Sequence, residues 1–277
     1  MEIRYSPDPA TFERMTTDEL RAHFLVGSLF ARDALPMVYS DVDRSITGSA
    51  VPVNRELQLA GNKKDLAAEY FLERRELGII NIGGGGVVTA DEHVHELGPK
   101  DGLYLGRGTK EVRFASRDSN SPARFYFVSY PAHAAYPTIR VRHSEAEPRR
   151  LGSSADANLR TIFKYFRPPA VRTCQLVMGL TELEEGCVWN TMPVHTHQRR
   201  SEIYMYFNIR DDALVIHLLG RPASTKHIIV REGQAVISPS WSIHSGVGTK
   251  NYSFIWAMGG ENQEFDDMDW VAMENLR

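Results

Sequence analysis

Residues 195–202 of the chain read His-Thr-His-Gln-Arg-Arg-Ser-Glu, and residues 233–244 read Gly-Gln-Ala-Val-Ile-Ser-Pro-Ser-Trp-Ser-Ile-His. These stretches hold three histidines and one glutamate at fixed spacings, namely His195, His197, Glu202 and His244. Side chains two residues apart on a β-strand point to the same face, so His195 and His197 can aim both rings at one ion. Three imidazole nitrogens and one carboxylate oxygen suit Zn, Fe, Mn, Ni or Co. The two stretches therefore predict a transition-metal site on a β-sheet.

The residues around these four predict how they come together. Residues 198–201 are the expected turn into an alternating strand that begins at Glu202. Gly233 permits a tight turn into a later strand, and Pro239 ends that strand before His244. Without a shared metal ion, three imidazoles and a carboxylate on a barrel wall would be unpaired polar groups, which are costly to bury. We therefore expect the four residues to meet on one concave surface of a β-barrel.

The composition is that of an ordinary globular protein. Apolar residues make up 42% and charged residues 24% of the 277 residues. The formal net charge is −3, and the sequence has no basic patch that would bind nucleic acid. No run approaches the ~18 apolar residues that cross a bilayer. The N-terminal stretch lacks the apolar core of a signal peptide, and only Cys174 and Cys187 are present. We expect no nucleic-acid partner, no membrane association and a cytoplasmic, reducing location.

Short strand-like runs recur along almost the whole chain. In the first half they are 78–82, 86–90, 102–105, 111–115 and 123–129, and in the second half 172–183, 202–208, 213–219, 225–230, 234–237 and 252–258. Each is bounded by Gly, Pro, Asp or Asn, which favours strands joined by tight turns. One helix is expected after Thr16, where Thr16-x-x-Glu19 has the form of a capping box. The sequence thus predicts an all-β sandwich or barrel with few helices.

Residues 131–160 interrupt this pattern with three prolines and many charges, which is typical of a linker between domains. On either side the two halves echo each other: the Arg-Arg-Glu of residues 74–76 resembles the Arg-Arg-Ser-Glu of residues 199–202. This repeat favours two similar β-domains, 1–140 and 141–277. The first half has no histidine that matches His244 and no His-x-His before Glu76. The N-terminal domain is therefore expected to be a copy without a metal site.

The chain resembles the cupin superfamily. The first cupin motif, His-x-His followed by Glu, corresponds to residues 195–202, and the second, Gly-x5-Pro-x-Gly-x2-His, corresponds to residues 233–244. Trp241 stands where the second motif has glycine, and Trp189 stands where a glycine usually precedes the first motif. These departures leave the four ligands intact and suggest a bulky indole at the pocket mouth.

Longer blocks resemble a particular family, the 4-deoxy-L-threo-5-hexosulose-uronate ketol-isomerases. The blocks are residues 71–84, 189–193, 237–249 and 260–269. The resemblance implies a bicupin fold of two double-stranded β-helix (jelly-roll) barrels, and one Zn²⁺ per subunit on His195, His197, Glu202 and His244. It also implies a homo-oligomer, in particular a hexamer. The implied activity is the aldose–ketose isomerisation of 5-dehydro-4-deoxy-D-glucuronate, a small-molecule uronate, in pectin degradation.

The sequence does not identify the residue that moves the proton. A cation is expected to hold the substrate carboxylate, and Arg199 and Arg200 are candidates because they adjoin the metal motif. A solvated turn or an ion pair is the alternative for both, and Lys164 and Lys250 are comparable candidates. Tyr204 and Trp241 are substrate-binding candidates that can equally be barrel lining.

Two other functions remain open from the sequence. The same cage with iron would suit a cupin dioxygenase, and a non-catalytic sugar-binding bicupin is the alternative outside the enzymes. The presence of all four ligands argues against the second. The pair His93 and His95 lacks a further ligand at cupin spacing and is interpreted as surface strand histidines.

Overall fold

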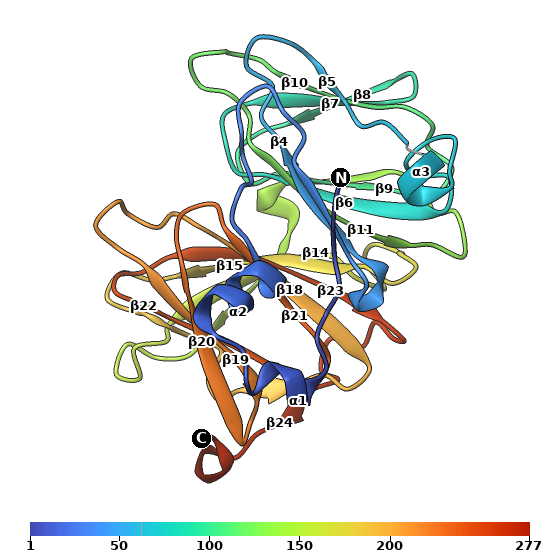
Figure 1. The fold of residues 1–277 in the computed structure, drawn as a ribbon. Coiled ribbons are helices and arrows are strands. Elements are labelled where there is room, and N and C mark those ends of the chain that lie inside the picture. The colour runs from blue at the N-terminus through green and yellow to red at the C-terminus, as the bar shows by residue number, and fades with distance from the viewer. Residues whose placement is uncertain (62) are drawn as a thin grey trace. The chain divides into compact units, whose positions relative to one another are not determined.

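The computed structural model describes residues 1–61 and 63–277 and consists mainly of strands, which confirms the predicted all-β class. The described chain divides into two compact units, coloured mainly blue to green and yellow to red in Figure 1. Unit 1 comprises Met1–Ile3, Ser28–Ala146 and Tyr165–Val177; unit 2 comprises Arg4–Gly27, Glu147–Lys164 and Met178–Arg277. Each contains one seven-stranded and one four-stranded sheet.

The sheets of unit 1 enclose an apolar interior. The seven-stranded sheet has the order β1 (Glu2–Arg4), β3 (Met37–Ser40), β4 (Ile46–Ala50), β11 (Phe125–Pro131), β6 (Arg75–Asn81), β9 (Gly102–Leu105) and β12 (Ile139–Val141). The four-stranded sheet has the order β5 (Leu57–Gln58), β10 (Val112–Ser116), β7 (Gly86–Ala90) and β8 (His93–Leu97). Phe114 of one sheet meets Phe125 of the other with ring centroids 5.2 Å apart, inside a cluster of buried aliphatic and aromatic side chains. This barrel is filled by its own side chains.

Unit 2 repeats this plan. Its seven-stranded sheet has the order β13 (Glu147–Leu151), β14 (Arg160–Phe166), β15 (Val177–Leu183), β23 (Ser253–Gly260), β18 (Arg200–Phe207), β21 (Ala235–Ser238) and β2 (Leu25–Val26). The four-stranded sheet has the order β16 (Trp189–Asn190), β22 (Ile243–Gly248), β19 (Val215–Arg221) and β20 (Ser224–Val230), and β17 (His195–Thr196) pairs with β24 (Asp269–Trp270). The order β4-β11-β6-β9 in unit 1 corresponds to β15-β23-β18-β21 in unit 2. Two barrels with one topology form the predicted bicupin fold.

The helices are short. They are α1 (Pro9–Phe12), α2 (Thr17–Phe24), α3 (Lys63–Leu66) and the 3-10 turns η1 (Val42–Arg44), η2 (His143–Glu145) and η3 (Met273–Asn275). The expected capping box is present, because the Thr16 backbone N–H donates to Glu19 Oε2 at 2.7 Å and Thr16 Oγ1 accepts from the Glu19 N–H. None of the described helices is long and apolar enough to cross a membrane. Cys174 and Cys187 are both free and buried.

The units do not consist of consecutive halves of the chain, such as the expected 1–140 and 141–277. Residues 4–27 belong to unit 2, where β2 pairs with β21 and Figure 1 shows α1 and α2 beside β19 and β20. The interpretation of residues 131–160 as a linker is wrong over much of its length. β12 pairs with β9, and β13 pairs with β14. Pro148 and its charged neighbours Glu147, Arg149 and Arg150 lie on the edge strand β13, where a missing donor and solvated side chains are tolerated.

A buried carboxylate attaches residues 165–177 to unit 1. Glu76 on β6 is fully buried and accepts hydrogen bonds from the backbone N–H groups of Cys174, Gln175 and Leu176 at 2.7–2.8 Å. It also accepts from the Tyr104 hydroxyl at 2.7 Å. Ionised acceptors of backbone donors form strong hydrogen bonds, and each buried donor left without an acceptor is costly.

Replacing Glu76 by glutamine is therefore expected to destabilise unit 1. An amide nitrogen cannot accept, so two of the four donors lose their acceptor at a cost of about 3 kcal/mol or more. Urea unfolding followed by circular dichroism measures the change. Glu92→Gln, at an exposed position of the same unit, is the control and should stay within about 0.5 kcal/mol of the parent protein. Equal midpoints for the two variants would contradict this role of Glu76.

Candidate metal centre

The four predicted ligand residues meet inside the barrel of unit 2. His195 lies on β17 with His197 just after it, Glu202 lies on β18, and His244 lies on β22. All four are at least 95% buried, and one ligand atom from each lies within 4.8 Å of the others. His195 and His197 come from one extended segment, while the pairing of β18 with β21 and of β22 with β19 sets the positions of the other two.

The distances suit a single small cation. His195 Nε2 lies 3.1 Å from His197 Nε2 and 3.0 Å from His244 Nε2. Glu202 Oε2 lies 3.1 Å from His197 Nε2 and 2.8 Å from His244 Nε2. Donors that are each about 2.0–2.2 Å from one ion lie roughly 3 Å apart. The cluster can therefore hold a metal ion.

The charge states also fit a metal site. Burial by itself would raise the pKa of Glu202, but His244 and His197 hold it well below the ordinary range, so the carboxylate is ionised. Burial, together with the neighbouring His244 and His197, lowers the pKa of His195 to about 2, so its ring is neutral. An ionised carboxylate and a neutral imidazole are the forms that bind metals.

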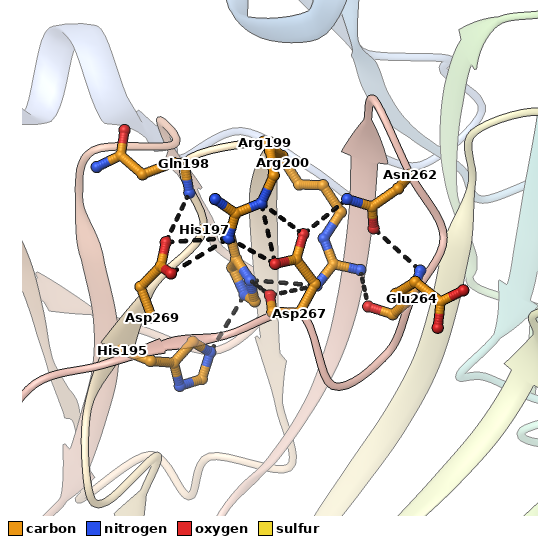
Figure 2. A network of polar contacts seen from close by, with 9 residues as sticks. All are labelled: His195, His197, Gln198, Arg199, Arg200, Asn262, Glu264, Asp267 and Asp269. Atoms are coloured by element: carbon orange, nitrogen blue, oxygen red, sulfur yellow. Dashed lines mark hydrogen bonds and ion pairs between the residues drawn. The ribbon is translucent and has the colours of Figure 1, made fainter.

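The backbone carbonyl of Asp267 orients His197 (Figure 2). His197 Nδ1 lies 2.7 Å from this oxygen, which can only accept, so Nδ1 carries the proton and Nε2 presents its lone pair to the cluster. Nη2 of Arg200 donates to the same carbonyl at 2.8 Å, and its Nη1 donates to the Glu264 carbonyl at 2.7 Å. The C-terminal segment, which is residues 261–270, thus holds a candidate ligand in one tautomer.

Arg199 fastens this segment by its side chain. Its Nε donates to the Asp267 carboxylate at 2.9 Å, and its Nη2 reaches both Asp267 and Asp269 (Figure 2). The Arg199 guanidinium, followed by the Asn262 amide, holds the pKa of Asp267 well below its usual range. Bidentate arginine–carboxylate contacts define geometry as well as energy.

A cavity of about 200 Å³ adjoins the cluster. It lies within unit 2, between the seven-stranded sheet and the C-terminal segment. Besides His195, His197 and Glu202, its lining comprises Arg149, Leu151, Arg160, Ile162, Thr181, Asn190, Thr191, Tyr204, Phe254, Trp256, Met258, Phe265, Asp266, Met268 and Trp270. A mainly apolar cavity with a few convergent polar groups is typical of a small-molecule site.

Of the predicted substrate-binding residues, only Tyr204 lines this cavity. Its ring centroid is 5.3 Å from that of His244. The described residues that line the cavity do not include Arg199, Arg200 or Trp241. Arg200 belongs to β18 and is 1% exposed. Its guanidinium donates to backbone carbonyls and does not face the cavity. Trp241 packs against Phe12, with ring centroids 5.2 Å apart, and does not line the cavity. The prediction that its indole lies at the pocket mouth is therefore wrong.

Sequence reasoning missed the two arginines and the C-terminal residues of the lining. Arg149 and Arg160 lie on β13 and β14, in the stretch interpreted as a linker. In the sequence, residues 260–269 stand out only as a block that carries the family resemblance. That resemblance is the signal that could have drawn attention to these residues. Nothing in their residue types indicates contact with β17. The two lysine candidates for the substrate carboxylate do not line the cavity. Lys164 Nζ lies 4.7 Å from the Phe265 ring centroid, and Lys250 is exposed.

A jelly-roll barrel with three histidines and one glutamate gathered inside it is a cupin barrel with a candidate metal site. A sequence model of the KduI/IolB family matches residues 27–273. The chain belongs to the KduI/IolB family.

Relatives in sequence agree with this assignment, and a solved structure shares the fold. The chain is 54% identical over 277 residues to a 4-deoxy-L-threo-5-hexosulose-uronate ketol-isomerase of Lachnoclostridium phytofermentans, covering 100% of both chains. It is also 54% identical over 278 residues to the protein of that name from Escherichia coli, again over the full length of both. The crystal structure of an IolB-like protein from Salmonella typhimurium superposes with a TM-score of 0.72 at 12% identity, covering 90% of this chain and 97% of that one. At that identity the superposition shows the shared fold.

Proposed function

We propose that this protein is a metal-dependent aldose–ketose isomerase that converts 5-dehydro-4-deoxy-D-glucuronate to 3-deoxy-D-glycero-2,5-hexodiulosonate. The observation that carries the proposal is the buried cluster of three imidazoles and one carboxylate that opens onto a cavity for a small molecule. Full-length relatives at 54% identity bear the ketol-isomerase name, which supports this reaction over oxygenation or simple sugar binding.

His195, His197, Glu202 and His244 would hold the metal. When bound there, a divalent cation would act as a Lewis acid toward the substrate's adjacent carbonyl and hydroxyl oxygens and stabilise the enediolate charge. Zinc is the metal we propose. Nitrogen and oxygen donors of this kind also bind iron. The donor set therefore supports a transition metal in general, without distinguishing zinc from iron.

The reaction must move a proton between adjacent carbons, which requires a base beside the substrate. The titratable side chains in the cavity lining are two arginines, three members of the metal cluster, Tyr204 and Asp266. Burial raises the pKa of Tyr204 well above its ordinary value, so its hydroxyl is a donor. We assign the proton transfer to Asp266, which remains after this elimination. Its carboxylate has no hydrogen-bond or ion-pair partner in the part of the chain that the structure describes.

Tyr204 and the aromatic residues of the lining would orient the substrate and keep water away. The Tyr204 hydroxyl lies 3.3 Å from Thr191 Oγ1 and can donate to a substrate oxygen beside the cluster. The Trp270 ring centroid is 5.2 Å from that of His195, and the Phe265 ring centroid is 5.5 Å from that of Trp256. These rings form an apolar cover that limits the access of water to the cavity and strengthens polar contacts within it.

The function is tested by following loss of the aldehyde of 5-dehydro-4-deoxy-D-glucuronate under anaerobic conditions, with metal-loaded and chelator-treated protein. We expect isomerisation with the loaded protein, loss of activity with chelator and recovery on adding Zn²⁺. Oxygen uptake in a parallel aerobic assay would instead indicate a cupin dioxygenase. Binding of the sugar without any turnover would indicate a non-catalytic bicupin.

The resemblance to the ketol-isomerase family supports three further proposals. These are a role in pectin degradation, a cytoplasmic location and a homohexamer. Sedimentation of the purified protein tests the hexamer directly.

Arg199 is expected to support metal binding indirectly, through the segment that orients His197. Residues that position a ligand histidine typically change metal affinity about 10- to 100-fold when they are removed. Arg199→Met should therefore weaken Zn²⁺ binding about 10-fold in a competition titration with a chromogenic chelator. Arg210→Met removes an exposed arginine–aspartate pair of the same unit and is the matched control. Identical affinities for the two variants would show that the segment holds its place without Arg199.

A further inference from the structure

One wall of the cavity carries two cations that the proposed function leaves without a role. β13 and β14 are antiparallel neighbours in which Leu151 lies opposite Arg160 and Arg149 lies opposite Ile162. All four side chains line the cavity, so this face of the strand pair forms one of its walls. Arg149 is exposed, whereas Arg160 is only 8% exposed.

Arg160 is a buried cation without a described counter-charge. Its Nη1 donates to the Asn158 carbonyl at 2.9 Å, and its Nε is buried with no acceptor. Within residues 1–61 and 63–277, no carboxylate forms an ion pair with it. Buried guanidinium groups are ordinarily paired, because an unpaired charge away from water is costly. A bound anion would supply the missing acceptors.

The position of Arg160 suits the far end of a substrate that reacts at the metal cluster. The guanidinium is close enough to Tyr204 for its charge to act on the phenol, and the Tyr204 ring lies beside His244. Tyr204 therefore has both the arginine and the cluster as neighbours in the cavity lining. A cavity of about 200 Å³ is smaller than the ~300 Å³ at which drug-sized pockets begin, which suits a monosaccharide that spans it from wall to wall.

We propose that Arg160 is the residue that binds the substrate's carboxylate, and that Arg149 at the open side of the same wall attracts it. This inference rests on the proposed function, because it concerns the uronate of that reaction. A guanidinium forms two parallel hydrogen bonds to a carboxylate, which orients the ligand as well as binding it. With the carboxylate on β14, the aldehyde end of the sugar points to His195, His197 and Glu202. Arg160 thereby makes the enzyme selective for uronates over neutral sugars.

The test compares Arg160→Gln with the parent protein on two substrates. One is the uronate, and the other is the same open-chain sugar with a hydroxymethyl group in place of the carboxylate. We expect the variant to raise KM for the uronate about 10- to 100-fold, the usual effect of losing a charged hydrogen-bonding partner. For the neutral sugar, kcat/KM should change less than about 2-fold, because no charged contact is lost. Equal losses on both substrates would overturn the inference, as would an unchanged KM for the uronate.

Two controls separate recognition from folding. Arg150→Gln lies on the opposite face of β13, where Arg150 pairs with Glu184 in solvent, and should leave both substrates unaffected. Arg160→Lys keeps the charge without the fork and should lie between the parent and Arg160→Gln, with bound metal equal to that of the parent. If Arg160→Gln fails to fold, Arg160→Lys carries the test, and a parental KM for this variant would overturn the bidentate contact.

A binding assay distinguishes failure of this inference from failure of the proposed function. Calorimetry with D-glucuronate and D-glucose needs no turnover. We expect the parent protein to prefer the glucuronate and Arg160→Gln to lose that preference. If the parent protein shows no isomerisation but this preference holds, the proposed reaction is wrong and the carboxylate site stands. If isomerisation holds and the preference is absent, the carboxylate site is wrong.

Discussion

Replacing His244 by alanine is expected to abolish metal binding and isomerisation while leaving the barrel folded. His244 is 1% exposed, and its Nε2 lies within 3.0 Å of both His195 Nε2 and Glu202 Oε2. Removing one of four ligands takes away the Lewis acid, which contributes several kcal/mol, so the rate should fall on the order of 10³-fold or more. Elemental analysis and the anaerobic aldehyde assay measure the two losses.

The barrel should persist because β22 keeps its backbone pairing with β19 and β16 whatever the side chain at position 244. Circular dichroism and thermal unfolding check this. His227→Ala on β20 removes an exposed histidine of the same sheet and is the control, with parental metal content and activity expected. A metal-free His244→Ala protein with full activity would refute the metal-dependent mechanism.

The second large effect is expected at Asp266. Asp266→Asn keeps the size of the side chain and removes its ability to take a proton, so kcat should fall about 10²- to 10⁴-fold. Metal content should stay at the parental level, because Asp266 lines the cavity without belonging to the cluster. This combination separates a proton-transfer role from the ligand role of His244.

Glu261→Gln in the same C-terminal segment is the matched control for Asp266→Asn. Glu261 is exposed, and its backbone N–H donates to the Arg199 carbonyl, a contact that the substitution preserves. It should retain parental kcat. If Asp266→Asn also retains it, the base lies elsewhere in the lining, and the elimination that led to Asp266 fails.

Local pattern predicted the elements well where a strand is bounded by turn residues. β7 and β9 have the predicted bounds, and α2 begins at the predicted capping box. Strands at sheet edges were missed: β13 carries Pro and Arg where alternation is expected, and its partner β14 follows a polar stretch. An edge strand is exposed on one side and needs little apolar alternation, so its sequence resembles a loop.

Arg199 and Arg200 show why the candidate site could be predicted only in part. Both adjoin a metal motif, and the sequence left open whether each binds the substrate carboxylate or belongs to a solvated turn or an ion pair. The structure turns Arg199 toward Asp267 and Asp269 and Arg200 toward backbone carbonyls of the same segment. Their partners are more than sixty residues away in the chain, and no local pattern records such a pairing.

The sequence by itself determined the four members of the metal cluster, the all-β class and the repetition of the barrel. Spacing within a strand decides which face a side chain occupies, and turn residues decide where strands end, so these features are local. Only the tertiary structure decided what surrounds the cluster. It brought Arg160 from β14, Tyr204 from β18 and Asp266 from the C-terminal segment to one cavity. Those approaches depend on sheet order and on the packing of distant segments, which are properties of the folded chain as a whole.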